Sequence, residues 1–391
     1  MKPFDAFFPV KIVMGAGRIN EIGKLTAQLG KKAFGVFDPF LKDGELIKQV
    51  RGYLKENGVE LVEFYKIVPN PRYTDMDEGM ELCKKEKCDS VVTIGGGSAI
   101  DTAKAIAIAV VHGGSTWDYT ERYFEADKVK RPKTKGLPLI AVPTTSGTGA
   151  EATLCAVVDE PVRKLKCAII NPAVYPDIAL LDPELTYSAP PMLTALTGLD
   201  TFAHAFESYL AKAATEFSEM LSLKSIELFI RSIRTAVKEP RNADARADMA
   251  LASCLAGASF CQASLCLPHA IGQPVSAITD APHGGSLAVC IPPIIEWTLP
   301  FAQEKIAKVA EMFDPSIAGL PVSEKARKIV PIIKKLYEDL NVKVSYKDYG
   351  MTEKDVVTCT DLVFAHFQWD IKGHPKEVTR EDVMDIYRKC L

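Results

Sequence analysis

Residues 90–111, SVVTIGGGSAIDTAKAIAIAVV, join a short β-branched run to a glycine turn and then to an alanine-rich stretch. Val, Ile and Thr favour strands, whereas Ala favours helices, so the segment predicts a strand, a turn and a helix. The N–H groups at the start of such a helix can bind a phosphate, and the glycines let it approach closely. Ser98 is placed to cap the helix, and Asp101 completes a capping-box spacing. A tight turn without a ligand is the alternative.

Further apolar runs on both sides of this segment alternate with helical stretches. They read KKAFGVFD (31–38), VELVEFYKIV (59–68) and LPLIAVPTT (137–145). This alternation is typical of βαβ units with a parallel sheet, whose ligands bind beyond the carboxyl ends of the strands. We therefore expect a Rossmann-like α/β nucleotide-binding domain over residues 1–185.

The strand pattern ends after Asp182 and Pro183, and long helical runs follow. Examples are LTALTGLDTFAHAFESYLA (193–211), ADMALASCLAGASF (247–260) and EKARKIVPIIKKLYEDL (324–340). The small residues in the first two runs allow helices to pack closely, and the third run is amphipathic. Residues 186–391 are therefore expected to form an all-α domain, whose last helix begins near Thr379.

Composition excludes several classes of protein. The chain has 391 residues, with 47 basic and 50 acidic side chains, so its formal charge is 47 − 50 = −3 and a general nucleic-acid binder is not expected. No uninterrupted apolar run approaches the roughly 18 residues of a transmembrane helix, so no membrane partner is expected. Pro3, Asp5 and Pro9 disfavour a secretory signal. None of the ten cysteines forms a CxxC pair, and we expect a cytoplasmic protein without disulfides.

The six histidines are unevenly placed, and three of them lie between residues 204 and 283. Asp200 and His204 are four residues apart and so share one helix face, which also points apolar neighbours inward. A buried carboxylate is costly unless it is paired or binds a metal. With His269, which follows a proline, and His283, in an expected turn, these residues make an oxygen and nitrogen set suited to Zn²⁺ or Fe²⁺. An ordinary helix pair with unrelated loop histidines is the alternative.

A hydroxyl-rich loop, PTTSGTGAEAT (143–153), follows the last apolar run of the first half. It contains a formal GxGxxA match at Gly147, Gly149 and Ala152, but the residues that follow are strand-like rather than helical. The match is therefore not a Rossmann fingerprint. The loop remains suited to bind ribose, phosphate or amide groups, with a plain loop as the alternative.

Taken together, these segments resemble the iron-containing (group III) alcohol dehydrogenase family. The similarity covers nearly the whole chain in order, through GGGSAIDTAK (95–104), PTTSGTGAEAT (143–153), NPAVYPDIALLDPEL (171–185), GLDTFAHAFESYL (198–210) and HAIGQPVSAITDAPHGG (269–285). It implies a two-domain enzyme in which a dinucleotide and a divalent metal, Fe²⁺ or Zn²⁺, face each other across a cleft. It also implies metal-assisted hydride transfer between a small alcohol or diol and its aldehyde or ketone.

The resemblance assigns roles residue by residue. The catalytic metal ligands would be Asp200, His204, His269 and His283. The cofactor-binding residues would be Gly96, Gly97 and Ser98 at the pyrophosphate, with Asp101 in the same motif, Thr144, Thr145 and Thr148 along the cofactor, Lys166 near its nicotinamide half, Asn70 and Asp38. A carboxylate at Asp38 accepts from ribose hydroxyls and repels a 2′-phosphate, so we expect NAD rather than NADP.

One position departs from the family pattern. Many members carry a second histidine four residues after the position of His269, and here it is Gln273. Glutamine forms hydrogen bonds but does not titrate, so the family's proton relay is not expected in its usual form.

Other enzymes on the same scaffold are the alternatives. A dehydroquinate synthase-like lyase would need basic groups for an anionic substrate, and the motif segments of this region, residues 198–210 and 269–285, contain no lysine or arginine. A glycerol dehydrogenase-like enzyme would use an Asp/His/His set without the fourth ligand. The resemblance also implies a homodimer or larger assembly, with residues 7–15 as an edge strand.

Overall fold

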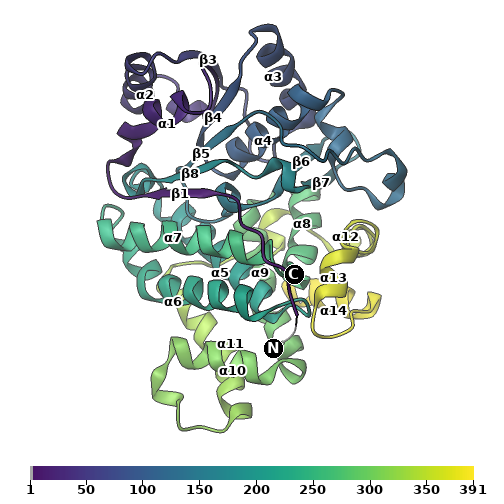
Figure 1. Ribbon diagram of the computed structural model, residues 1–391. Helices are drawn as coiled ribbons and strands as arrows, with labels where there is room; N and C mark the ends of the chain where they lie inside the picture. Colours follow the sequence, from purple (N-terminus) through teal and green to yellow (C-terminus); the bar gives the residue numbers. More distant parts are fainter. Residues whose placement is uncertain (1–2) are drawn as a thin grey trace. The chain divides into compact units, whose positions relative to one another are not determined.

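The computed structural model describes residues 3–391, which form two compact units (Figure 1). One unit comprises Phe8–Thr145 and Gly149–Ser188. The other comprises the N-terminal residues up to Phe7, the short stretch Ser146–Thr148 and Ala189–Leu391. Each unit has its own hydrophobic core, so each is described by itself.

The first unit is built on a parallel sheet of six strands in the order β1-β8-β5-β4-β2-β3. The strands are β1 (Lys11–Met14), β2 (Lys32–Phe37), β3 (Glu60–Phe64), β4 (Ser90–Gly95), β5 (Leu139–Pro143) and β8 (Ile178–Leu181). This confirms the expected parallel α/β fold, and it places β1 at one edge of the sheet. An antiparallel hairpin of β6 (Cys155–Glu160) and β7 (Leu165–Ile170) follows the 143–153 loop, as the strand-like sequence there predicted.

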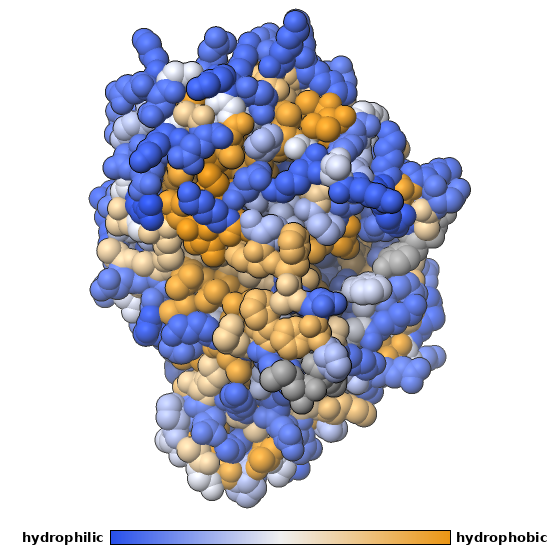
Figure 2. Space-filling model, viewed as in Figure 1, coloured by the Kyte–Doolittle hydropathy of each residue, from blue (hydrophilic) through white to orange (hydrophobic). Residues whose placement is uncertain are grey.

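Helices cover both faces of this sheet, which explains why β4 and β5 are buried along their whole length. On one face, α1 (Ile22–Ala27) and α2 (Glu45–Glu56) pack against alternate strand residues such as Phe37 and Ile94. On the other face, α3 (Tyr73–Lys85) and α4 (Gly97–His112) pack against Phe34 and Val91. Figure 2 shows mainly hydrophilic side chains over α2, whose apolar residues face the sheet.

The second unit is helical, as predicted from its sequence. Its helices are α5 (Pro191–Leu210), α6 (Glu216–Lys238), α7 (Ala243–Phe260), α8 (Leu267–Thr279), α9 (His283–Thr298), α10 (Gln303–Phe313), α11 (Val322–Asp339), α12 (Glu353–His366), α13 (Gln368–Gly373) and α14 (Arg380–Cys390). The last helix starts with a capping box between Thr379 and Asp382, at the predicted position. Among residues 3–391, no helix is both long and apolar enough to cross a lipid bilayer.

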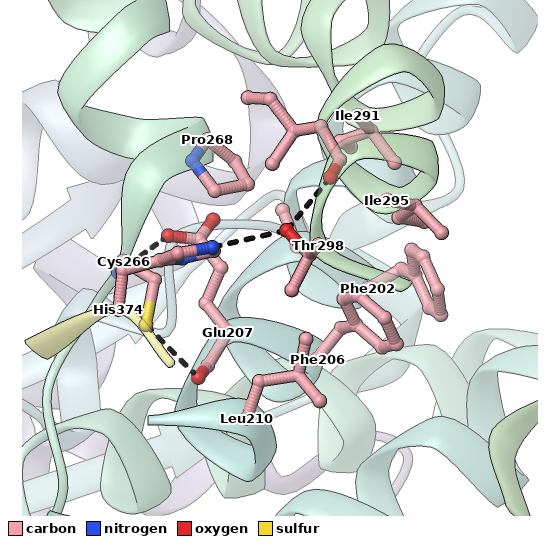
Figure 3. A pocket seen from close by; sticks show the side chains of 12 residues that line it. Phe202, Phe206, Glu207, Leu210, Cys266, Pro268, Ile291, Ile295, Thr298 and His374 are labelled. Carbon is pink, nitrogen blue, oxygen red and sulfur yellow. Dashed lines mark hydrogen bonds between the residues drawn. The ribbon is translucent and has the colours of Figure 1, made fainter. Parts of the chain in front are cut away.

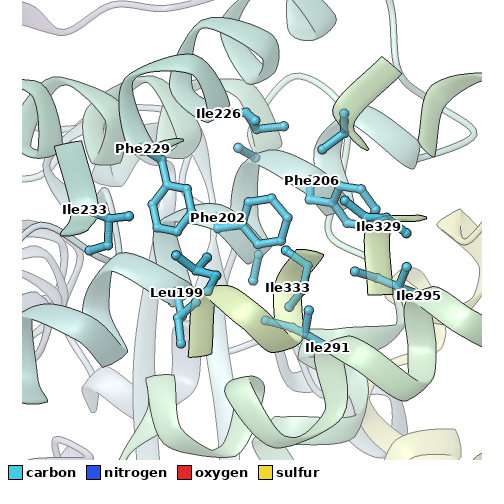
Figure 4. Close-up of a cluster of buried hydrophobic side chains, with 14 of the residues drawn as sticks. Leu199, Phe202, Phe206, Ile226, Phe229, Ile233, Ile291, Ile295, Ile329 and Ile333 are labelled. Atoms are coloured by element: carbon cyan, nitrogen blue, oxygen red, sulfur yellow. The ribbon is translucent and has the colours of Figure 1, made fainter. Parts of the chain in front are cut away.

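Helix α5 lies at the centre of this unit, and its residues from Gly198 to Leu210 are all buried. Phe202 stacks between Phe206 and Phe229, with ring centroids 5.4 Å away in each case (Figure 4). Phe313 meets the Phe202 ring edge-on. Small residues elsewhere on α5 let α6, α7 and α9 approach it closely. The helix that carries Asp200 and His204 is therefore rigidly held.

Phe202→Ala should destabilise the helical unit by about 3–5 kcal/mol, because it removes a fully buried ring and leaves a cavity. Chemical denaturation followed by circular dichroism measures this. Phe301→Ala is the matched control, since Phe301 is 56 % exposed, and it should change the free energy of unfolding by less than about 1 kcal/mol. Equal losses for the two variants would contradict the central role of α5.

Candidate functional site

Asp200 lies at the centre of a buried cluster of imidazoles in the helical unit. Its Oδ1 is 3.5 Å from Nδ1 of His204, 3.6 Å from Nε2 of His269 and 3.6 Å from Nε2 of His283. Asp200 is only 2 % exposed, so its charge is removed from water. The structure thus brings together all four residues that the sequence singled out, from helices α5, α8 and α9.

Three of these residues fit a metal ion by geometry. One ligand atom each of Asp200, His269 and His283 lies within 4.8 Å of the other two. Oδ1 of Asp200 and Nε2 of His269 are buried without a hydrogen bond. Buried polar atoms normally have partners, so two such atoms aimed at one point fit a ligand that binds both. Carboxylate oxygen and imidazole nitrogen suit Zn²⁺ or Fe²⁺.

The charges in this cluster are strongly coupled. Burial acts to raise the pKa of Asp200, but the neighbouring imidazoles outweigh burial and lower it. Burial acts to lower the pKa of His269, but the carboxylates of Glu207 and Asp200 raise it to about 10. A cation that takes the place of the proton on His269 would meet the same negative charges. Metal binding here therefore competes with protons.

His204 is adjacent to this three-residue group but is not a member of it. Its Nδ1 lies 3.3 Å from the carbonyl oxygen of Gly147, and its ring stacks on that of His269 with centroids 4.4 Å apart. The carbonyl belongs to Ser146–Thr148, the short stretch of the 143–153 loop that is part of the helical unit. The role of His204 as a fourth ligand stays a prediction.

The sequence predicted a turn at His283, but this residue is instead the first residue of α9. The following residue, Gly284, explains its position. A Cβ at Gly284 would lie 2.3 Å from the carbonyl oxygen of Leu196, so only glycine lets α9 begin directly against α5. This close contact brings the imidazole of His283 beside Asp200.

Glu207 is a residue that the sequence reasoning missed. It is 1 % exposed, and its Oε1 lies 2.6 Å from Nδ1 of His269. The signal was present, because residues 200, 204 and 207 follow the spacing of one helix face. Its partner, however, is 62 residues away in the sequence, and no local pattern predicts that contact.

In the α/β unit, the glycine turn lies where the strand order reverses. The chain moves outward from β2 to β3 and returns to β4 on the other side of β2, so the carboxyl ends of β2 and β4 are the point where ligands usually bind to such sheets. Asp38 directly follows β2, and a Cβ on Gly95 would lie 3.1 Å from Cβ of Asp38. The two predicted cofactor elements are therefore neighbours at the usual ligand position of such sheets.

The predicted cap of α4 is wrong. Gly96 is the N-cap residue, and Ser98 lies inside the helix. Gly96 is extended, with φ −75° and ψ −173°, so the helix begins at Gly97, two residues before it would begin if Ser98 were the N-cap. Asp101 instead accepts a hydrogen bond from the backbone N–H of Val157, and burial raises its pKa to about 6. No side chain caps this helix end, and its N–H groups remain suited to an anion.

Two other predicted cofactor residues are bonded to each other. Lys166, on β7, donates a hydrogen bond from Nζ to Oδ1 of Asn70 at 2.9 Å. Asn70 adopts a left-handed conformation with φ 55°. The loop around it joins the hairpin through a bond from the N–H of Asp159 to the carbonyl of Pro71. The β6–β7 hairpin therefore positions both residues.

The loop after β5 holds the predicted threonines. Thr144 donates its N–H to the carbonyl of Gly95, and the side chain of Thr145 faces Gly96. Thr148 belongs to the segment grouped with the helical unit, where Thr201 donates to the carbonyls of Ser146 and Gly147. The structure thus places Thr144 and Thr145, but not Thr148, in the unit that carries the glycine turn.

Lys104 is a second residue that was missed. It is fully buried on α4, and its Nζ donates to the carbonyls of Thr153 and Cys155 and to Oγ1 of Thr153, each at 2.8 Å. The ammonium group therefore ties α4 to the end of the 143–153 loop. A lysine in an apolar helix is a signal for such a bond, because a buried charge needs partners.

A small cavity lies beside Glu207 in the helical unit (Figure 3). Its lining is mostly apolar, with Phe202, Phe206 and Ile295, and it includes His374 and Thr298. Thr298 donates its hydroxyl hydrogen to the carbonyl of Ile294, so it accepts from Nε2 of His374 at 3.0 Å. His374 is only 1 % exposed.

The chain matches known proteins over its full length. The family model described as iron-containing alcohol dehydrogenase matches residues 9–183, and the model for the C-terminal part of the Fe-containing alcohol dehydrogenase family matches residues 194–391. The NAD-dependent methanol dehydrogenase of Bacillus methanolicus is 32 % identical, over 98 % of this chain and 99 % of that protein. The 1,3-propanediol dehydrogenase of Klebsiella pneumoniae is 32 % identical, over 99 % and 98 %.

The fold is also similar to solved structures. The crystal structure of the alcohol dehydrogenase ADH/D1, an archaeal halo-thermophilic protein from a Red Sea brine pool, has a TM-score of 0.94 at 32 % identity. The similarity covers 100 % of both chains.

His374 is expected to make the stability of the helical unit depend on pH. Burial, with Lys212 and Lys376 nearby, lowers its pKa to about 3, whereas an unfolded histidine titrates near about 6.5. Between these values the unfolded chain binds the extra proton, so stability is lost as the pH falls, at up to about 1.4 kcal/mol per pH unit.

His374→Gln keeps an N–H for Thr298 and removes the titrating ring. It should therefore lose less free energy of unfolding than the wild type between about pH 6 and pH 4. Denaturant unfolding at several pH values measures the difference. Parallel pH profiles for the two proteins would contradict this assignment.

Proposed function

The chain belongs to the iron-containing alcohol dehydrogenase family, and from that premise we propose that it interconverts a small alcohol or diol with its aldehyde or ketone, using NAD and one divalent cation. It is an oxidoreductase that acts on CH–OH groups. The observation that carries the proposal is the buried Oδ1 of Asp200, which three imidazoles approach to within 3.5–3.6 Å.

We assign the cation to Asp200, His269 and His283, with His204 as the fourth ligand that the family resemblance implies. The buried negative charge of Asp200 favours a cation, and three neutral imidazole nitrogens satisfy it without adding charge. When bound, the cation would supply Lewis acidity at the alcohol oxygen, and NAD would supply the hydride acceptor. A mixed set of carboxylate and imidazoles is also unlike the thiolate sets of structural zinc sites.

We assign the dinucleotide to the α/β unit and the cation to the helical unit. The domains predicted from the sequence, residues 1–185 and 186–391, differ from these units in that Ser146–Thr148 and the residues up to Phe7 group with the helical unit. The N-terminus of α4, with Gly96, Gly97 and Ser98, is suited to the pyrophosphate. Thr144 and Thr145 supply hydroxyl groups, with Lys166 and Asn70 at the nicotinamide half, whereas the role of Thr148, which groups with the helical unit, stays a prediction. Asp101 supports the glycine turn from the protein side, because its carboxylate accepts a hydrogen bond from the backbone of β6.

The substrate class rests on the relatives. Two of the relatives are named for methanol and for 1,3-propanediol, which are short and uncharged. We propose a substrate of that kind, because the segments that carry the proposed metal ligands, residues 198–210 and 269–285, contain no lysine or arginine to bind an anionic one. This also disfavours a dehydroquinate synthase-like lyase. A cytoplasmic location and a homodimer or larger assembly stay predictions.

A glycerol dehydrogenase-like activity is the second candidate. The observation in its favour is the three-residue group of Asp200, His269 and His283, which excludes His204. Glycerol turnover together with a His204→Ala variant that retains its metal would favour this candidate. Loss of metal in that variant would favour the four-ligand site.

Asp200→Asn and His283→Ala should bind less than a tenth of the wild-type metal, and should lose at least about 1,000-fold in turnover, or about 4 kcal/mol. Metal content after dialysis measures the loss of binding. The loss of turnover is measured as NADH formation from methanol, 1,3-propanediol, 2-propanol and glycerol, with added Fe²⁺ or Zn²⁺. NADH binding should be unchanged, because these residues lie outside the α/β unit. His112→Ala is the control. Full activity of either variant after chelation would contradict the metal assignment.

Asp38→Ala should raise the ratio of kcat/KM for NADP to that for NAD by at least about tenfold, or about 1.4 kcal/mol. The carboxylate at the end of β2 would otherwise repel a 2′-phosphate. Initial rates with both cofactors measure the ratio. Asp43→Ala, an exposed neighbour, should leave it unchanged. A wild type that prefers NADP would contradict the role of Asp38.

A further inference from the structure

The carboxylate of Glu207 uses both of its oxygens at the start of α8. Oε1 lies 2.6 Å from Nδ1 of His269. Oε2 accepts the backbone N–H of Cys266 at 2.7 Å and that of His269 at 3.4 Å. Cys266 is the N-cap residue of α8, and no side chain of its own segment caps the helix. Glu207 therefore supplies both a cap for α8 and a partner for the imidazole that α8 carries.

The imidazole has only one productive arrangement in these contacts. A neutral histidine carries one N–H, and a carboxylate beside Nδ1 keeps the hydrogen on that nitrogen. Nε2 then presents its lone pair, and this nitrogen lies 3.6 Å from Oδ1 of Asp200 without a hydrogen bond. The nearest hydrogen-bond partner of His204 is instead the backbone carbonyl of Gly147, which is a weaker acceptor than a carboxylate.

We propose that Glu207 is a positioning residue for the metal centre: its carboxylate fixes the ring and the tautomer of His269 so that Nε2 faces the cation. The inference rests on the proposed function, since it presupposes a metal at Asp200. Three residues on one face of α5 then have separate tasks. Asp200 binds the cation, His204 is the fourth ligand that the family resemblance implies, and Glu207 holds His269, a ligand that comes from another helix.

The substitution Glu207→Gln separates the charge of Glu207 from its size. The amide has nearly the same shape, but its NH₂ group cannot accept the N–H groups that the second carboxylate oxygen accepts. Loss of the partner that holds a metal-binding histidine typically weakens metal affinity by roughly 10- to 100-fold. Glu207→Asp keeps the charge but withdraws it by one methylene, so we expect an intermediate loss.

The metal affinity of purified protein tests the proposal without any measurement of turnover. Metal-free wild type, Glu207→Gln and Glu207→Asp are titrated with Zn²⁺ against a chromophoric chelator, and with Co²⁺ to record the ligand-field absorption bands. We expect a dissociation constant raised about 10- to 100-fold in Glu207→Gln, with altered Co²⁺ bands, and unchanged NADH binding. Ser208→Ala is the control, because Ser208 is the next residue of α5, is fully buried and bonds Ser259 at 2.6 Å instead.

The outcomes distinguish this proposal from the function that it rests on. A wild type that binds neither Zn²⁺ nor Co²⁺ would overturn the proposed function. A wild type that binds tightly, with Glu207→Gln within about twofold of it, would overturn only the role of Glu207. Equal losses in Glu207→Gln and Ser208→Ala would also overturn it, because they would indicate general damage to α5. If Glu207→Gln does not fold, the same comparison of Glu207→Asp with Ser208→Ala decides.

Discussion

The burial of one negative charge, the carboxylate of Asp200, is the constraint on which the helical unit depends. A carboxylate taken out of water is unstable unless positive charge or hydrogen bonds compensate it. Here the compensation comes from imidazoles on three helices, which must therefore start and cross at fixed places. The close packing of α5 keeps water away and makes each contact stronger than it would be at the surface.

The same constraint explains several local features of sequence. Gly284 lets α9 start against α5, and a Cβ on Gly198 would lie 2.3 Å from Cδ1 of Ile233, so glycine there leaves room for this side chain of α6 against α5. In the α/β unit, the limiting feature is instead the reversal of strand order between β2 and β4. This reversal brings Asp38 and the glycine turn together at the carboxyl ends of β2 and β4.

Local pattern was enough to predict β2 to β5, the helical half and the set of Asp200 with His204, His269 and His283, because these follow from periodicity and from the spacing of unusual polar residues. It did not predict β8, a strand of only four residues. It failed where backbone geometry or distant partners decide. Gly96 begins α4 in place of a Ser98 cap, and His283 begins a helix where a turn was expected. Glu207 and Lys104 depend on partners about 50 to 60 residues away, which no window of sequence contains.

X-ray absorption spectroscopy of the protein loaded with one equivalent of Zn²⁺ is the most direct test of a single cation held by a carboxylate and imidazoles. The account predicts a first shell of nitrogen and oxygen only, at roughly 2.0–2.2 Å, with the outer-shell scattering of at least two imidazole rings. Sulfur neighbours at about 2.3 Å, or a shell without imidazole scattering, would contradict it.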